Sequence, residues 1–90
     1  MEIQAKVIQV LKAKGGVSAR TGKPWASQEY VIETEGEYPK KICIEVFGED
    51  KIKELNLQLN MRYQFSIDID ASEYNGRWYN RIKCWNAIAF

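Results

Sequence analysis

The chain has 90 residues, of which 46% are apolar and 28% charged, and its formal net charge is +1. This composition is typical of one folded globular domain rather than of a disordered chain. Because the sequence contains no histidine, most zinc sites and every Ser-His-Asp or Cys-His mechanism are excluded, and we expect neither an enzyme nor a cofactor.

No apolar run approaches the ~20 residues that a membrane-spanning helix needs. The N-terminus also lacks the basic start and apolar stretch of a signal peptide, so we expect a cytoplasmic protein with no membrane partner. The two cysteines, Cys43 and Cys84, belong to no Cys-x-x-Cys or metal-ligand motif, and we expect two free thiols.

The first half of the chain predicts two strands separated by a long loop. Residues 2–12 begin with apolar-polar alternation that loses its phase from Ile8 onward, which predicts a strand containing a bulge. Residues 13–24 are rich in glycine and end in proline, and they predict a loop. Residues 25–35 predict the second strand, and residues 36–39 predict a turn.

The second half predicts a strand, a helix and a final hairpin. Residues 40–47 alternate cleanly, whereas the apolar residues within 48–59 recur every three or four positions, which predicts a short amphipathic helix. Residues 61–70 alternate again, residues 71–77 predict a hairpin loop, and residues 78–88 predict the last strand. The inward positions of the third and fourth predicted strands are Ile42, Ile44, Val46, Met61, Tyr63, Phe65, Ile67 and Ile69.

Three amphipathic strands, a helix and two further strands predict an all-β class and a five-stranded OB-fold, a small Greek-key barrel with one helix between strands three and four. We expect a single domain over residues 1–90. Phe47 and Tyr63 are expected in its core or against the helix.

The last predicted strand presents aromatic and basic side chains on one face. It follows Asn75-Gly76, the strongest short signal for a hairpin. Alternation places the following side chains on the outward face: Tyr79, Arg81, Lys83 and Trp85. Rings stack on bases and cations neutralise phosphates, so this face predicts a nucleic-acid site. A subunit interface, in which Trp and Tyr are also enriched, is the main alternative.

Two other segments add candidate binding residues. In OB-folds the first loop and the hairpin between the last two strands flank the ligand cleft. The residues at these positions are Arg20, Lys23, Trp25, Tyr74, Arg77 and Trp78. The alternative for Trp25 and Trp78 is that they cover the ends of the barrel. Lys41 either extends the ligand cleft along the third predicted strand or forms a solvated charge pair with Lys40 beside the glutamates of residues 24–37.

Positive charge is concentrated near the two ends of the chain. Residues 1–23 hold five bases against one acid, and residues 71–90 hold three bases against one acid. Residues 24–37 hold four glutamates and no base, so this segment should lie away from phosphates or face a basic partner.

Three sequence runs carry a resemblance to a known family: Gln28-Glu29-Tyr30-Val31-Ile32-Glu33-Thr34, Tyr38-Pro39-Lys40-Lys41 and Glu73-Tyr74-Asn75-Gly76-Arg77-Trp78-Tyr79. With them, nearly the whole chain resembles a small bacterial family of uncharacterised OB-fold domains that is similar to single-stranded-DNA-binding proteins. The sequence has no acidic tail after its last strand, which makes it more similar to tail-less relatives such as the dimeric primosomal replication protein. The resemblance implies an OB-fold and nucleic-acid binding.

The sequence therefore predicts a non-catalytic module that binds single-stranded DNA, with RNA as the less favoured ligand. A single small barrel holds few bases, so we expect a homo-oligomer, either a dimer or a tetramer. The alternative is an OB-fold used for protein interaction or oligomeric assembly without nucleic-acid binding.

Overall fold

The computed structural model describes residues 1–17 and 19–90, and over these residues the chain is mostly β-structure. Six strands and one short helix follow each other in the order β1 (Glu2–Val10), β2 (Lys14–Val17), β3 (Pro24–Thr34), β4 (Lys41–Phe47), α1 (Glu49–Leu55), β5 (Arg62–Tyr74) and β6 (Arg77–Ala89).

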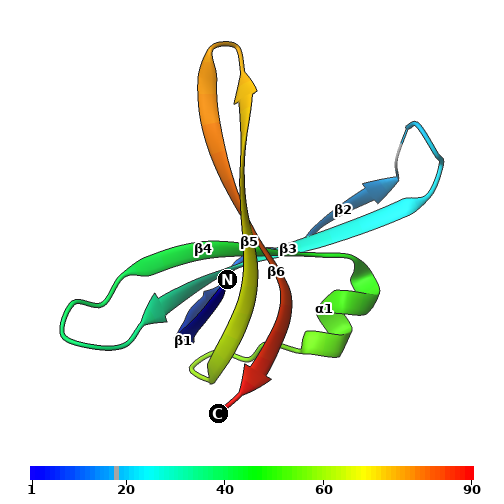
Figure 1. Cartoon of the computed structure of the whole chain (residues 1–90). Helices are drawn as coiled ribbons and strands as arrows, with labels where there is room; N and C mark the ends of the chain where they lie inside the picture. Colours follow the sequence, from blue (N-terminus) through cyan, green and yellow to red (C-terminus); the bar gives the residue numbers. More distant parts are fainter. Residues whose placement is uncertain (18) are drawn as a thin grey trace.

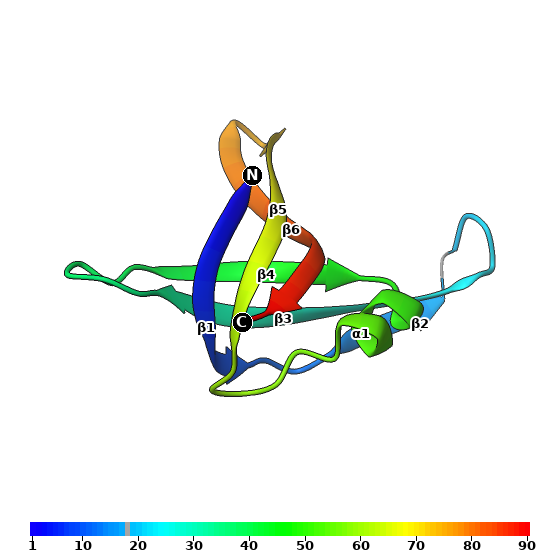
Figure 2. The same cartoon turned by 60° about the horizontal axis from the view of Figure 1, so that its bottom comes forward.

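The strands form one sheet that closes on itself as a ring (Figures 1 and 2). The strand order is β1-β5-β6-β4-β3-β2, and an additional pairing of β1 with β3 closes the ring. Only β4 and β6 run parallel among the described pairs, and all the others are antiparallel. β1 and β2 pair with successive parts of the same edge of β3, so β2 lies outside the ring.

Alternating apolar residues of the ring strands form the core, as the sequence predicts. Ile32, Ile44, Val46 and Phe65 have no exposed surface, and burying each side chain contributes about 1.5–3 kcal/mol. Tyr63 is also buried, and its hydroxyl accepts a hydrogen bond from the backbone N–H of Gln58 at 3.0 Å. The expectation that Tyr63 belongs to the core is confirmed.

The predicted bulge in the first strand is confirmed. The register of β1 against β3 shifts between Val7 and Gln9, so that Ile8 is the extra residue. A bulge increases the local bend of a strand. This bend lets β1 pair with β3 along one part and with β5 along another.

The helix is shorter than the predicted range 48–59. It covers Glu49–Leu55 and ends at Asn56, whose φ of 44° is left-handed and whose N–H bonds to the carbonyl of Ile52. Glu49 and Asp50 occupy its first turn, where the helix dipole favours acids. Ile52 and Leu55 pack against the core, as the pattern predicts, but Leu59 lies beyond the helix and is exposed.

The loop predicted for residues 13–24 is wrong in part, because Lys14–Val17 forms β2. This strand contains two glycines and no alternation, so nothing local distinguishes it from a loop. Its pairing with Pro24–Ser27 of β3 supplies the hydrogen bonds that make it a strand. The predicted count of five strands is therefore corrected to six.

The loop predicted for residues 71–77 is also wrong, although its Asn-Gly turn is confirmed. β5 and β6 continue to a two-residue turn at Asn75 and Gly76, whose φ angles are 53° and 77°. Two positive φ angles are typical of the type I′ turn that suits a hairpin. Beyond the ring the two strands project as a hairpin, residues 69–74 and 77–82, which we call the arm (Figure 1).

The arm explains why some predicted core positions are exposed. Ile69 has the inward parity of Phe65 and Ile67, yet it is 54% exposed because β5 has passed the edge of the ring. Met61, also predicted inward, precedes β5 and is exposed. In the described part of the chain no helix has the length and apolar character that a bilayer crossing requires.

Candidate nucleic-acid interface

Two aromatic rings stack on the outer face of the sheet. Trp25 of β3 and Phe47 of β4 lie with ring centroids 6.5 Å apart and planes 5° from parallel. Their exposed fractions are 40% and 57%. Gly16 of β2 lies beneath the indole, and a Cβ there would stand 3.2 Å from its Nε1. The glycine therefore allows Trp25 to lie close to β2.

A third ring extends this pair onto β6. Phe47 and Trp85 each lie two residues beyond the pair Glu45–Lys83, which joins the parallel strands β4 and β6. Phe47 and Trp85 line a cavity of about 350 Å³ together with Lys51, Asp68, Lys83 and Cys84. Trp85 is 52% exposed. We call Trp25, Phe47 and Trp85 the aromatic row, which crosses β3, β4 and β6.

The cations of the aromatic row lie close to acids. Lys51 and Lys83 line the same cavity, and so does Asp68. Asp68 is the cross-strand neighbour of Lys83 in the β5–β6 register. Lys51 also lies 3.6 Å from Glu54 on the helix. The cavity can therefore attract phosphate through two ammonium groups, but its positive charge is partly balanced.

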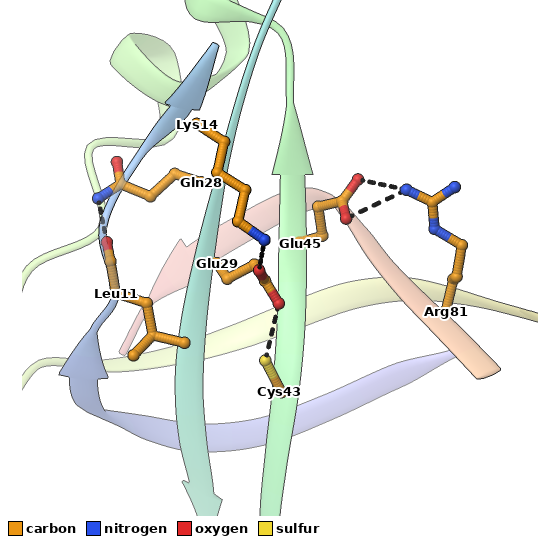
Figure 3. A network of polar contacts seen from close by, with 7 residues as sticks. All are labelled: Leu11, Lys14, Gln28, Glu29, Cys43, Glu45 and Arg81. Atoms are coloured by element: carbon orange, nitrogen blue, oxygen red, sulfur yellow. Dashed lines mark hydrogen bonds and ion pairs between the residues drawn. The ribbon is translucent and has the colours of Figure 1, made fainter. Parts of the chain in front are cut away.

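The centre of the same face is a network of polar contacts (Figure 3). Lys14 of β2 donates to Glu29 of β3 at 2.9 Å, and the Cys43 thiol donates to the other oxygen of Glu29 at 3.3 Å. Arg81 of β6 donates to Glu45 of β4 at 3.2 Å. These residues line a second cavity of about 310 Å³.

The network shifts the pKa of its members in opposite directions. The hydrogen bond from Lys14, followed by the one from Cys43, lowers the pKa of Glu29, and the same contact with Glu29 raises the pKa of Lys14. Burial, followed by the hydrogen bond to Glu29, raises the pKa of the Cys43 thiol. At neutral pH Glu29 is therefore anionic, Lys14 cationic and Cys43 a neutral thiol.

The structure brings together only part of the predicted site. Trp25, Lys83 and Trp85 belong to the aromatic row or its cavity. Arg81 shares their face but is held by Glu45. Lys41 pairs in register with Glu33, at the opposite end of β4 from Phe47. This position favours the alternative interpretation of Lys41, a solvated charge beside the acidic segment, over a role in the binding site.

The remaining predicted residues lie on the two projecting hairpins. Arg20 and Lys23 lie between β2 and β3, and Lys23 is two residues from Trp25. Tyr74 and Arg77 face each other at the tip of the arm. Tyr79 alternates with Trp78, so the two rings lie on opposite faces of the arm, with exposed fractions of 47% and 68%. Trp78 is therefore not on the face of the aromatic row.

Sequence reasoning missed Phe47, Lys51 and Lys14 as site residues. Phe47 was expected in the core or against the helix, yet it is exposed and stacks on Trp25. The alternation of residues 41–47 already gave Phe47 an outward parity, and this signal could have identified it. Among residues 1–17 and 19–90, no group of three His, Cys, Asp or Glu side chains is placed to hold a metal ion.

Comparison with known proteins identifies the family. The family model described as a Domain of unknown function (DUF3127) matches residues 2–88, which is nearly the whole chain, and the chain belongs to this family. No curated protein and no solved structure matches it.

Proposed function

We propose that this DUF3127 domain is a non-catalytic OB-fold module that binds single-stranded DNA, with RNA as the less favoured ligand. The observation that carries the proposal is the aromatic row. Trp25, Phe47 and Trp85 come from three different strands, and each exposes between 40% and 57% of its surface on one face. Exposed rings in a row are typical of surfaces that stack bases without regard to sequence.

The order of strands supports the OB-fold part of the proposal. Without β2, the ring runs β1-β3-β4-β6-β5, and the helix lies between the third and fourth ring strands. OB-folds are five-stranded Greek-key barrels that bind ligands on strands two and three, between the first loop and the last hairpin. The corresponding elements are β3 and β4, which carry Trp25 and Phe47, and the β2–β3 and β5–β6 hairpins.

Binding would combine stacking with a small number of phosphate contacts. Each base stacked on a ring of the row would contribute about 1–3 kcal/mol. Lys51 and Lys83 line the cavity beside Trp85, and Lys23 lies two residues from Trp25. Contacts to about two or three phosphates predict that the logarithm of affinity falls with the logarithm of salt concentration with a slope of about 1.5–2.

We test the proposal by titrating intrinsic tryptophan fluorescence with oligo-dT at low salt. Trp85→Ala and Phe47→Ala should each weaken binding about tenfold or more, because each removes a stacking platform. Tyr38→Ala is the matched control, since Tyr38 is 79% exposed but lies on the β3–β4 turn, away from the row. No quenching by oligo-dT, or equal losses in all three variants, would refute the proposal.

The second candidate is a protein-interaction or oligomeric assembly module without nucleic-acid binding. The observation that favours it is the neutralised centre of the face, where Lys14 pairs with Glu29 and Arg81 with Glu45. A face with balanced charge attracts polyanions weakly. Oligo-dT titration separates the candidates, because an assembly module would self-associate or bind protein without quenching by the oligonucleotide.

A further inference from the structure

We propose that Asp68 gives the candidate site a preference for guanine at the position of Trp85. This preference rests on the proposed function and adds to it a choice of base at one position of an otherwise sequence-tolerant surface. Phe47 and Trp85 line a cavity of about 350 Å³, and Asp68, Lys51 and Lys83 line it with them. The chemistry of these five side chains carries the proposal.

A β-bulge sets the position of Trp85 at this cavity. The register between β5 and β6 passes from Ser66–Asn86 to Ile67–Cys84, so Trp85 is the extra residue on β6. Cys84 is buried, whereas Trp85 is 52% exposed. Bulges occur often beside binding sites, where they change the direction in which a side chain points. The bulge therefore favours a ring placed for a ligand over one placed for packing within the sheet.

The size and the walls of the cavity suit one nucleobase. Its volume of about 350 Å³ lies at the small end of the range for ligand pockets. Trp85 on β6 provides a surface for stacking, and Phe47 on β4 provides a second apolar wall. A base stacked on the indole directs its polar edge sideways, toward the polar side chains that line the cavity. These side chains can therefore distinguish one base from another.

Asp68 has two acceptor oxygens available for such an edge. It is exposed, and within residues 1–17 and 19–90 its carboxylate forms no hydrogen bond or ion pair, although Lys83 is its cross-strand neighbour. Asp70, which has the same parity on β5, differs in this respect. Its Oδ1 accepts a hydrogen bond from the backbone N–H of Ala71 at 2.9 Å.

Guanine is the base whose edge matches a free carboxylate. It carries two adjacent donors, N1–H and the N2 amino group, and one carboxylate accepts a hydrogen bond from each. Cytosine and adenine offer one amino group beside an acceptor nitrogen, and the N3–H of thymine lies between two carbonyl oxygens that repel a carboxylate. Proteins read unstacked bases of single strands on these edges, and hydrogen bonds to a charged acceptor are the strong ones.

The lysines supply contacts for the backbone of the same nucleotide. Lys83 forms no ion pair in the described part of the chain, and Lys51 lies 3.6 Å from Glu54 on the helix. Both ammonium groups line the cavity and can approach the phosphates beside the bound base. Asp68 repels these phosphates, which lowers affinity for a strand whose base does not donate to it. This repulsion widens the difference between guanine and the other bases.

Competition against a fluorescein-labelled oligo-dT, followed by anisotropy, tests the preference. The competitors are oligo-dT strands of about ten nucleotides with one central guanine, hypoxanthine, cytosine or adenine. The guanine strand should compete about tenfold better than unsubstituted oligo-dT, because a bidentate contact separates bases by about this factor. Hypoxanthine lacks the N2 amino group and should lose most of this gain.

Two results of this competition separate the preference from the proposed function. Equal competition by the guanine strand and by unsubstituted oligo-dT would overturn the preference and leave single-stranded-DNA binding in place. No binding of the labelled oligo-dT or of the guanine strand would overturn both.

Asp68→Asn and Asp70→Asn form a matched pair, because both residues are exposed on β5 and both variants lose one negative charge. Asp68→Asn should lose the preference for guanine, since an amide offers one acceptor and places a donor against the second N–H. It should bind oligo-dT at least as tightly as the wild type does. Asp70→Asn should keep the preference. A preference for guanine that persists in Asp68→Asn, or that is lost in both variants, would overturn the assignment to Asp68.

Discussion

The guanidinium of Arg81 on β6 donates hydrogen bonds to both carboxylate oxygens of Glu45 on β4, at 3.2 and 3.3 Å. The two residues are 36 positions apart in sequence, and the pair joins the parallel strands of the ring. Arg81 is one of the cations that the sequence predicts on the nucleic-acid face, and in the structure Glu45 is its partner. Glu45 therefore competes with phosphate for Arg81.

Glu45→Gln should strengthen binding of oligo-dT. The substitution releases Arg81 and removes a negative charge from the face, so affinity should rise several-fold and the salt slope should steepen by up to about 0.7. Loss of a partly exposed ion pair costs only about 0–1 kcal/mol of stability. Fluorescence titration at several salt concentrations measures both effects.

Glu37→Gln is the matched control for this prediction. It makes the same change in net charge on the exposed β3–β4 turn, away from the aromatic row. Equal gains in the two variants would show that only total charge matters. Weaker binding by Glu45→Gln would show that the Arg81–Glu45 pair organises the face rather than inhibiting it.

Glu29→Gln should change how the free energy of unfolding depends on pH in the acid range. Lys14 and Cys43 lower the pKa of Glu29 below its ordinary value of 4.5, so the unfolded chain takes up this proton before the folded chain does. The stability that ionised Glu29 contributes is therefore present above pH 4.5, and it is lost as the pH falls through the lowered pKa of the folded state. Urea unfolding between about pH 3 and 6 should therefore show a weaker acid dependence in Glu29→Gln. An identical dependence would contradict the Lys14–Glu29 contact.

Cys43 should react slowly for an exposed thiol. Partial burial and the hydrogen bond to Glu29 raise the pKa of Cys43 above the ordinary 9.0, so little thiolate is present at neutral pH. Alkylation by iodoacetamide should be faster in Glu29→Gln and slower in Lys14→Gln, because the positive charge of Lys14 lowers the pKa of Cys43. Mass spectrometry follows the reaction, and Cys84, which is buried, should remain unmodified. Equal rates in both variants would contradict this network.

Local patterns predicted the ring better than the parts outside it. Clean alternation predicted the buried positions Ile44 and Val46, and the phase change near Ile8 predicted the bulge in β1. These signals depend only on neighbouring residues. β2 and the exposure of Ile69 depend instead on where a partner strand begins or stops, and no local pattern encodes that.

The candidate site shows the same division. Trp85 was predicted from the alternation of the last strand, and Trp25 from its place at the end of the first loop, and both signals are local. The Arg81–Glu45 pair was missed because it joins distant strands through a parallel register. Trp78 was predicted as a binding residue because the last hairpin flanks the ligand cleft of OB-folds, but its parity places it on the opposite face from Tyr79.

The turn of the arm provides a prediction about local stability. Asn75 and Gly76 both have positive φ, at 53° and 77°, which costs a residue with a Cβ about 1 kcal/mol unless its side chain suits the conformation. Gly76→Ala should therefore lower the protection of arm amides against hydrogen exchange about fivefold, while ring amides such as that of Phe65 keep theirs. Asn75→Gly should be tolerated, because glycine adopts positive φ freely. If Gly76→Ala lowered protection equally in the arm and the ring, the arm would unfold together with the ring rather than as a separate local unit.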